Sequence, residues 1–179
     1  MNRSKTLEQF LKSVERRAFR MAMLAVKNEA DALDIVQDSM MKLANSYGHL
    51  QGTDGTDQWR PLFHTILQNC IMDFHRKQTR WRRWFVRQND DEDEIAVQDK
   101  MVDLELNPEQ NLQTQQMGTE VLELIETLPV QQQQCFLLRS WEELSVQQTA
   151  DIMKISQSSV KTHYARAVQK IQQVINEKA

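Results

Sequence analysis

The chain has 179 residues, with 22 Lys and Arg against 25 Asp and Glu, a length that suits one medium domain or two small ones. It contains only four glycines and three prolines, whereas Leu, Met, Gln, Ala and Glu, which favour helices, are abundant. No run of alternating apolar and polar residues indicates a strand, and no stretch resembles a signal peptide or a membrane span. The composition therefore predicts an all-α protein that is not inserted in a membrane.

Charge is unevenly distributed along the chain. Residues 1–88 hold 15 Lys and Arg against nine Asp and Glu, a net charge of +6. Residues 89–117 hold one against nine, a net charge of −8, and residues 118–179 hold six against seven, a net charge of −1. This pattern predicts a helical domain at 1–88, a flexible acidic linker with the start of the next helix at 89–117, and a second helical domain at 118–179.

Three helices are expected in the first domain. Residues 7–27 and 29–46 each carry apolar residues at the 3.6-residue period of an amphipathic helix. Gly48, Gly52 and Gly55 then mark a loop, and a third helix begins near residues 59–61 and continues to about 87. Its inward face is expected to hold Leu62, Ile66, Leu67, Cys70, Ile71 and Phe74.

The most basic stretch of the chain directly precedes its most acidic one, in RWRRWFVRQNDDEDE, residues 80–94. If the third helix continues, one of its faces holds Arg76, Arg80, Arg83 and Arg87, with Lys77, Trp81 and Trp84 alongside. Arginines interleaved with aromatic residues are typical of surfaces that bind single-stranded nucleic acid, where rings stack on bases and cations hold the backbone. The alternatives are a basic amphipathic helix on a membrane surface and tryptophans that pack in the core.

Four helices are expected in the second domain. Asn107 and Pro108 favour a helix start, and this helix ends near Leu128 because Pro129 disfavours helical backbone in the residue before it. Further helices are expected at about 130–139, 145–153 and 157–176. Cys70 and Cys135 both lie in apolar helical patterns, which favours reduced thiols in the cytoplasm over a disulfide.

Residues 145–171, SVQQTADIMKISQSSVKTHYARAVQKI, predict a helix-turn-helix. Ser145 and Gln148 match a capping box, Ile155 fills the angle of the turn, and Ser156 can cap the next helix. The inward face of that helix is expected to hold Val160, Tyr164, Ala167, Val168, Ile171 and Ile175, and the outward face Ser158, Lys161, Thr162, Ala165, Arg166 and Gln169. The outward face suits a recognition helix in a major groove, and the alternative is a helical hairpin with a solvated face.

Together these segments resemble the extracytoplasmic-function (ECF) sigma factors of bacterial RNA polymerase, over about residues 7–88 and 107–176. DALDIVQDSMMKL, residues 31–43, resembles the core-binding helix of that family, whose usual form is near D-A-E-D-L-V-Q-E-x-F-x-x-L. The alternative is a solvated acidic face on a core helix. The resemblance implies contacts with the clamp helices of the β′ subunit from Asp31, Asp34, Ile35, Gln37, Asp38, Met41 and Lys42.

The third helix also resembles the family, through LFHTILQN at residues 62–69 and the Asp and Arg that follow it. Asn69 falls where the family's asparagine holds a base flipped from the minus-ten element, and the alternative is a structural asparagine. The chain departs from the pattern at Leu62, where Trp is usual, at Thr65, where Arg is common, and at Trp59, which stands three residues early. The resemblance assigns minus-ten DNA contacts to Asn69, Asp73, Arg76, Lys77, Arg80, Trp81 and Arg83.

The second domain resembles the family's reader of the minus-thirty-five element. The positions that match its DNA contacts are Ser158, Lys161, Thr162, Ala165 and Arg166. As partners the resemblance implies core RNA polymerase, through the β′ clamp helices and the β flap, promoter DNA and an anti-sigma factor. The acidic linker would thread into the polymerase; residues 90–94 could also shield the basic surface beside them, or form a plain solvated connection.

Two other classes of function compete with this interpretation. A helix-turn-helix regulator that binds DNA without joining polymerase is the first alternative, and it has no need of the segment at residues 31–43. An enzyme is poorly supported, because His49, His64, His75 and His163 lack metal-ligand spacing and neither cysteine lies in a nucleophile motif. We expect no catalysis, no metal and no cofactor.

Overall fold

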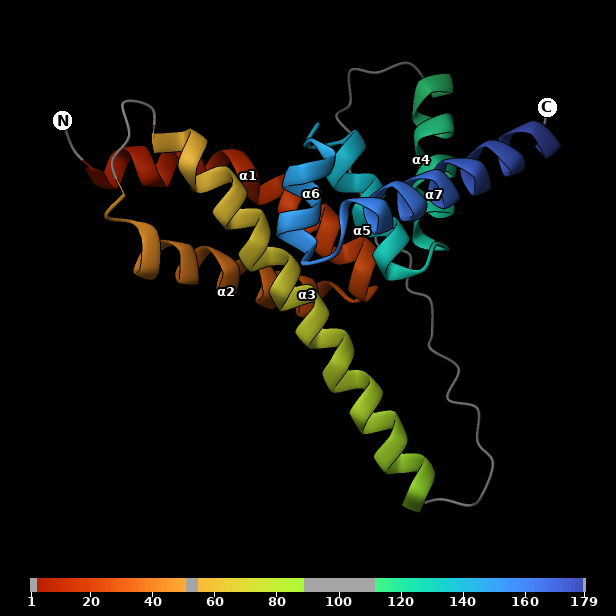
Figure 1. Ribbon diagram of the computed structural model, residues 1–179, viewed down its shortest axis with the longest axis horizontal. Helices are drawn as coiled ribbons and strands as arrows, with labels where there is room; N and C mark the ends of the chain where they lie inside the picture. Colours follow the sequence, from red (N-terminus) through yellow and green to blue (C-terminus); the bar gives the residue numbers. More distant parts are fainter. Residues whose placement is uncertain (1–2, 51–54, 89–111, 179) are drawn as a thin grey trace. The chain divides into compact units, whose positions relative to one another are not determined.

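The computed structural model describes residues 3–50, 55–88 and 112–178, which form seven helices and, within these ranges, no strand (Figure 1). The chain divides into two compact units, Met1–Asp103 and Leu104–Ala179. The predicted all-α class with two helical domains is confirmed, while the predicted domain boundaries near 88 and 118 stay predictions. The acidic stretch at residues 90–94 and the predicted helix start at Asn107 lie outside the described residues.

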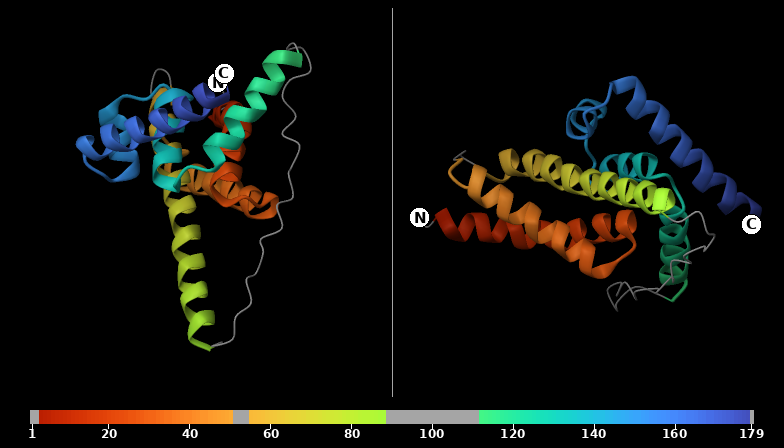
Figure 2. Two further views of the ribbon diagram at one scale, coloured as in Figure 1. Left: turned by 90° about the vertical axis from the view of Figure 1, so that its right-hand side faces the viewer. Right: turned by 90° about the horizontal axis from the view of Figure 1, so that it is seen from below.

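The first unit contains three helices that pack against one another: α1 (Arg3–Val26), α2 (Glu29–Tyr47) and α3 (Gly55–Gln88). Asn28 separates the first two, since its side-chain oxygen caps α2 by accepting a hydrogen bond from the Asp31 amide at 3.0 Å. The C-terminal half of α3 extends past α1 and α2, as Figure 1 and the left-hand view of Figure 2 show. Side chains on that half of the helix are therefore displayed away from the core of the unit.

Large apolar side chains from all three helices fill the core of the first unit. Trp59 anchors α3 there, because its ring lies 5.7 Å from that of Phe10 and its indole N–H donates to the Tyr47 carbonyl at 3.0 Å. Trp59, which stands three residues before the position where the family usually has Trp, is thus part of the core. The fully buried core residues include Met21, Ala22, Ala32, Leu43, Phe63, Leu67 and Ile71.

The predicted inward face of α3 is partly wrong. Leu67 and Ile71 are buried as expected, but four of the predicted residues are only half-buried, namely Leu62, Ile66, Cys70 and Phe74. Phe63, His64 and Gln68 are buried in their place. The physical reason is the anchor at Trp59, which turns the positions four, eight and twelve residues further along the helix toward the core.

The second unit contains α4 (Leu112–Glu126), α5 (Val130–Ser140), α6 (Val146–Met153) and α7 (Gln157–Lys178). The bounds of the last three agree with the sequence predictions within two residues, and Pro129 takes the N-cap position of α5. Ile175 was expected to face inward but is 45% exposed, whereas Val174 is half-buried. The apolar stripe of α7 continues from Ile171 at a spacing of three residues there, which leaves Ile175 in solvent.

Candidate polymerase and nucleic-acid interfaces

One side of α2 presents acidic and amide groups together with large apolar side chains. Leu33 is 44% exposed and Met41 is 63% exposed. Because residues four apart share a helix face, these side chains form one continuous surface with their polar neighbours. We call it the α2 surface; it consists of Leu33, Asp34, Gln37, Asp38, Met41 and Lys42, all exposed.

The α2 surface differs from the predicted core-binding set at three positions. Ile35 is buried and packs in the core, so its side chain is not available to a partner, which corrects its assignment. Asp31 is half-buried at the start of the helix. The sequence did not single out Leu33 as a contact residue, because the exposure of an apolar side chain depends on how α2 packs against the other helices.

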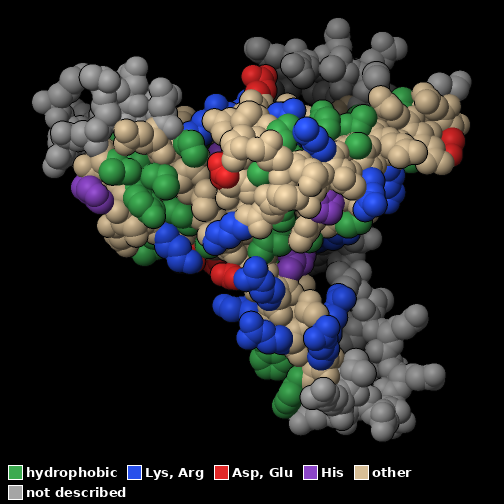
Figure 3. Space-filling model, in the orientation of Figure 1, with side chains coloured by type: hydrophobic (Ala, Val, Ile, Leu, Met, Phe, Trp, Pro, Cys, Tyr) green, Lys and Arg blue, Asp and Glu red, His purple; other side chains and the backbone are tan. Residues whose placement is uncertain are grey.

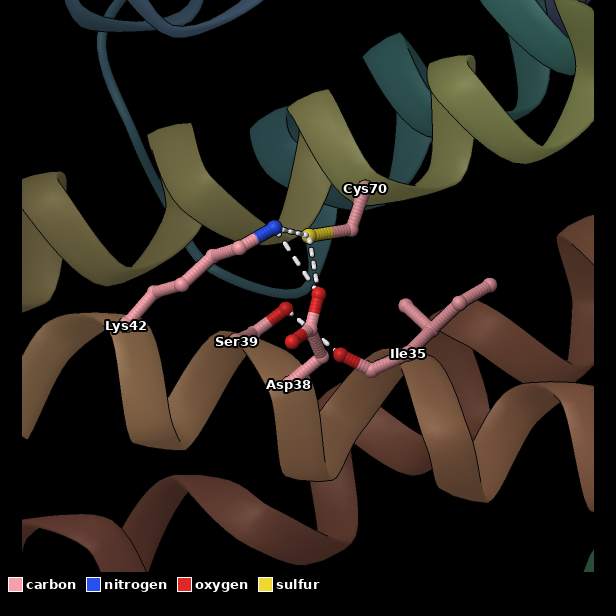
Figure 4. A network of polar contacts seen from close by, with 5 residues as sticks. All are labelled: Ile35, Asp38, Ser39, Lys42 and Cys70. Atoms are coloured by element: carbon pink, nitrogen blue, oxygen red, sulfur yellow. Dashed lines mark hydrogen bonds and ion pairs between the residues drawn. The ribbon is translucent and has the colours of Figure 1, made fainter.

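A polar network ties the α2 surface to α3 (Figure 4). Lys42 Nζ lies 2.8 Å from the Asp38 carboxylate and donates to Cys70 Sγ at 3.6 Å, while the Cys70 thiol faces the same carboxylate at 3.9 Å. The hydrogen bond from Lys42 to Asp38 raises the pKa of that lysine. Both charged side chains remain more than half exposed, so the pair orients the carboxylate more than it stabilises the fold.

The candidate base-binding residues lie on α3. Asn69 is half-buried, while Asp73 and Arg76 are exposed on the following turns and pair with each other at 3.0 Å. Thr65, at the position where an arginine is common, donates its hydroxyl to the Pro61 carbonyl at 2.9 Å. The structure thus brings Asn69, Asp73 and Arg76 onto one side of α3, and Asn69 lies closest to the core.

Beyond these residues, α3 carries three exposed aromatic rings. Trp81 is 61% exposed, and Trp84 and Phe85 are each 51% exposed. Their centroids lie 5.6 to 6.0 Å apart, so the rings contact one another. We call these three residues the ring cluster. The alternative that these tryptophans pack in the core is wrong.

Basic side chains surround the ring cluster. Figure 3 shows Lys and Arg side chains along the part of α3 that extends past α1 and α2, with hydrophobic side chains near its end. Those that the structure describes as exposed are Arg76, Lys77, Arg80, Arg82 and Arg83, and the Arg87 side chain lies outside the described residues. The sequence interpretation missed Phe85 and Arg82, although their position between named tryptophans and arginines was a usable signal.

The turn of the helix-turn-helix has the predicted local structure. The Ser145 side chain accepts from the Gln148 amide at 3.0 Å, and the Gln148 side chain accepts from the Ser145 amide at 2.9 Å, which completes the capping box. Lys154 ends α6 in the left-handed conformation, with φ at 55°. Ser156 then accepts from the Ser159 amide at 3.1 Å, and half-buried Ile155 packs on the core below. These contacts fix the angle between α6 and α7.

The outward face of α7 is exposed at every predicted position. This set, which we call the α7 surface, is Ser158, Lys161, Thr162, Ala165, Arg166 and Gln169. The opposite face is held by Tyr164, whose ring stacks on Phe136 at 6.0 Å and lies 5.6 Å from the Arg139 guanidinium. Burial of Val160 and Ala167 completes that contact. The α7 surface therefore combines two cationic side chains, Lys161 and Arg166, with small or polar neighbours on a firmly positioned helix.

No metal or membrane site was found in the part of the chain that the structure describes. Within these residues, no three His, Cys, Asp or Glu side chains are grouped so that they could hold an ion. Among the same residues, none of the helices combines the length and the apolar character needed to cross a bilayer.

Comparison with known proteins identifies both units. Residues 6–81 match the family "Sigma-70 region 2" and residues 119–171 match "Sigma-70, region 4". The chain is 30% identical over 151 residues to the RNA polymerase sigma factor SigV of Bacillus subtilis (strain 168), which covers 84% of this chain and 79% of SigV.

A solved structure shares the fold. It is the sigma factor RpoE of Bartonella quintana, crystallised with the anti-sigma factor NepR; the TM-score is 0.61 at 22% identity, over 94% of this chain and 96% of that one. The match of residues 6–81 to region 2 disfavours a helix-turn-helix regulator that does not join polymerase. The chain belongs to the ECF sigma factors, which are not a class of enzymes but bind core RNA polymerase, recognise promoter DNA and direct the initiation of transcription.

Proposed function

We propose that the α2 surface binds the clamp helices of the β′ subunit of core RNA polymerase. The observation that carries the proposal is the exposure of Leu33 and Met41 between acidic and amide side chains. Apolar residues at the centre of an interface supply most of the binding energy, and charged neighbours set the encounter and the register. Lys42 holds the Asp38 carboxylate in place before the partner arrives.

On α3, we assign the recognition of melted minus-ten DNA to Asn69 and the residues that follow it. A half-buried amide offers both a donor and an acceptor to the edge of one flipped base. The exposed cations of the next turns, including Arg76 and Arg80, are placed to neutralise the phosphates of the same strand. Trp81 supplies a ring on which a neighbouring base can stack.

On α7, we assign the reading of the minus-thirty-five duplex to the α7 surface. Lys161 and Arg166 can donate to phosphates or to guanine edges, and the Thr162 methyl group can contact thymine. The Thr162 hydroxyl donates to the Ser158 carbonyl at 3.0 Å, which fixes that side chain. The second unit would also contact the β flap, as the family resemblance implies.

We further infer an anti-sigma partner and a cytoplasmic site of action. RpoE, which shares this fold, was crystallised with an anti-sigma factor, and the α2 surface offers such a protein an exposed apolar patch. Core polymerase works on chromosomal DNA, which places its promoter-recognition subunit in the same compartment. None of these roles requires a cofactor or a reaction catalysed by this chain.

Run-off transcription with purified core polymerase tests the proposal. The template is the promoter upstream of this protein's own gene, and a second template carries the same sequence with its minus-ten and minus-thirty-five elements scrambled. We expect a discrete transcript from the first template only when the chain is present. Transcription at the same level from both templates, or a failure of the chain to co-elute with core polymerase, would overturn the assignment.

A further inference from the structure

Three hydrogen-bonded side chains connect the two helices of the helix-turn-helix on their exposed side. Gln157, the first residue of α7, donates from Nε2 to Gln147 Oε1 on α6, and Gln147 Nε2 donates to the Asp151 carboxylate at 2.9 Å. We call these residues the amide network, and we infer that Gln157 reads one adenine of the minus-thirty-five duplex, with Asp151 as its positioning residue. The inference rests on the proposed function of α7 and adds to it one specified base contact.

The position of Gln157 places it beside residues already assigned to DNA. In a helix-turn-helix, the N-terminal residues of the recognition helix contact base edges in the major groove. Gln157 is exposed and precedes Lys161 by four residues, so the two side chains lie on one face of the helix. Ser156 caps this turn by accepting from the Ser159 amide at 3.1 Å, which fixes the backbone at Gln157. Gln157 therefore extends the α7 surface by one turn toward the N-terminus of the helix.

Asp151 determines which way each amide of the network is turned. An ionised carboxylate only accepts hydrogen bonds, so Gln147 must direct its NH2 group at Asp151. The carbonyl oxygen of Gln147 then faces Gln157, and only the NH2 group of Gln157 can donate to it. A glutamine without such partners can turn its amide over and exchange donor and acceptor. The carboxylate on α6 thus sets the orientation of an amide on α7.

The remaining groups of the Gln157 amide select the base. Gln147 accepts one hydrogen of Nε2, which leaves the second hydrogen and Oε1 to face the DNA together. Adenine presents the matching pair in the major groove, because its N7 accepts and its N6 amino group donates. Guanine presents two acceptors there, so one of them would face Oε1 of Gln157 without a hydrogen. Adenine is therefore the purine that satisfies both groups of the side chain.

The charge of Asp151 acts on DNA in the opposite sense to its effect on orientation. Asp151 is exposed next to a surface that is proposed to bind DNA, and a negative charge there repels phosphates. Asp151→Asn removes this repulsion and also allows position 151 to donate as well as accept. The change should therefore strengthen binding to DNA of every sequence and reduce the preference for adenine. A residue that only stabilised the fold would not change these two quantities in opposite directions.

Holoenzyme binding to the promoter upstream of this protein's own gene tests the reading of adenine. Each position of the minus-thirty-five element is replaced in turn by the other base pairs, and each adenine also by 7-deazaadenine, which lacks the N7 acceptor. We expect wild type to lose about tenfold in affinity when one particular adenine is replaced, and part of that with 7-deazaadenine. Gln157→Ala should bind the natural element about tenfold more weakly and no longer distinguish bases at that position. Gln172→Ala, the same change at an exposed site further along α7, is the control and should behave as wild type.

Two further variants test the positioning role of Asp151. Asp151→Asn should lower the adenine preference about fivefold while raising affinity for a scrambled element. Combining Asp151→Asn with Gln147→Glu moves the carboxylate to position 147, where it accepts directly from Gln157 Nε2. The double variant should restore the preference at unchanged net charge. Thermal unfolding should change little in both variants, since hydrogen bonds between exposed side chains contribute little to stability.

Several results would overturn the inference. Wild type that tolerates every replacement of adenine would exclude the contact, and a uniform loss for all elements in Gln157→Ala would assign that side chain to phosphate. Full adenine preference in Asp151→Asn, or no recovery in the double variant, would exclude the positioning role. Lys161→Ala and Arg166→Ala report on the proposed function separately. If they weaken promoter binding while Gln157→Ala keeps wild-type discrimination, only the present inference fails; if neither does, the proposed function of α7 fails.

Discussion

Two helices of this sigma factor, α3 and α7, both turn a basic face to solvent, but the side chains between the cations differ. On α3 they are Trp81, Trp84 and Phe85, all at least half exposed. On the α7 surface they are Ser, Thr, Ala and Gln, and the aromatic Tyr164 is half-buried against Phe136. Rings suit unpaired bases, while short polar side chains let a helix enter the groove of an intact duplex. The difference supports the proposed assignment of α3 to melted DNA and of α7 to paired DNA.

The two helices are also fixed in different ways. A capping box, a left-handed Lys154 and the stacked Tyr164 set the direction of α7 from its first turn. In contrast, α3 is anchored in the core near Trp59, and its described side chains from residue 76 to 85 are all exposed. A reader of paired bases needs a fixed register, whereas a surface that stacks on a single strand gains from reach.

The largest expected effect comes from weakening the association with core polymerase, on which the promoter contacts of both helices depend. Reversing Asp34 and Asp38 to Lys on the α2 surface should weaken association with core polymerase by several kcal/mol, because like charges then face each other across the interface. Co-elution and run-off transcription measure the loss. Glu15→Lys with Glu123→Lys makes the same change of charge at exposed sites outside the α2 surface and serves as the control. Normal co-elution of the Asp34 and Asp38 variant would contradict the assignment.

The next largest effect is expected from the two cations of the α7 surface. Lys161→Ala and Arg166→Ala should each cost about 1–3 kcal/mol in binding to minus-thirty-five duplex if the side chain contacts a base, with relaxed specificity at one position. A phosphate contact should instead weaken all sequences alike and lower the salt slope by about 0.9. Filter binding with single-base variants of the element distinguishes the two. Lys170→Ala, exposed on α7 outside the α7 surface, is the control, and wild-type binding by both test variants would exclude this face as the reader.

A smaller effect should follow from loosening α6 and α7 without touching DNA contacts. Ser145→Ala removes the side-chain half of the capping box and should cost about 1 kcal/mol of stability in the second unit. Ser145→Asp keeps an acceptor and should restore most of it. Thermal unfolding measures both. We expect minus-thirty-five binding to weaken with Ser145→Ala while oligothymidylate binding stays the same; a parallel loss of both would argue against separate tasks for the two helices.

The smallest effect concerns pH and the packing of α3 on α1. Burial lowers the pKa of His75 below its ordinary value of 6.5, partly offset by a hydrogen bond with the Ala25 backbone. The unfolded chain therefore binds a proton first as the pH falls below about 6.5, and the first unit loses stability until the folded pKa is passed. His75→Gln should flatten this part of the curve. Urea unfolding between pH 5 and 7.5 provides the measurement, and an unchanged slope in the variant would refute the role of His75.

Local signals made most of the helix boundaries predictable. Ser145, Pro129 and Gly48 act through contacts within a few residues, so their effect can be read from the sequence, whereas α3 begins at Gly55 and not near residues 59–61 as predicted. The inward face of α3 could not be read in the same way, because apolar residues stand on several sides of the helix and the Trp59–Phe10 contact joins segments about 50 residues apart. The exposure of Leu33 and of the ring cluster could not be predicted for the same reason. Apolar and aromatic residues are usually buried, and only tertiary packing decides whether a particular side chain is exposed.

Permanganate footprinting of a single promoter with two variant holoenzymes tests most directly whether α3 binds melted DNA and α7 binds the duplex. Asn69→Ala should occupy the closed promoter almost as well as wild type but leave the thymines of the minus-ten region less reactive, since its partner is an unstacked base. Lys161→Ala should need more holoenzyme to occupy the promoter and, once saturated, should melt it fully. Equal melting by Asn69→Ala and wild type, or a melting defect of Lys161→Ala that persists at saturation, would contradict the assignment of α3 to melted DNA and α7 to the duplex.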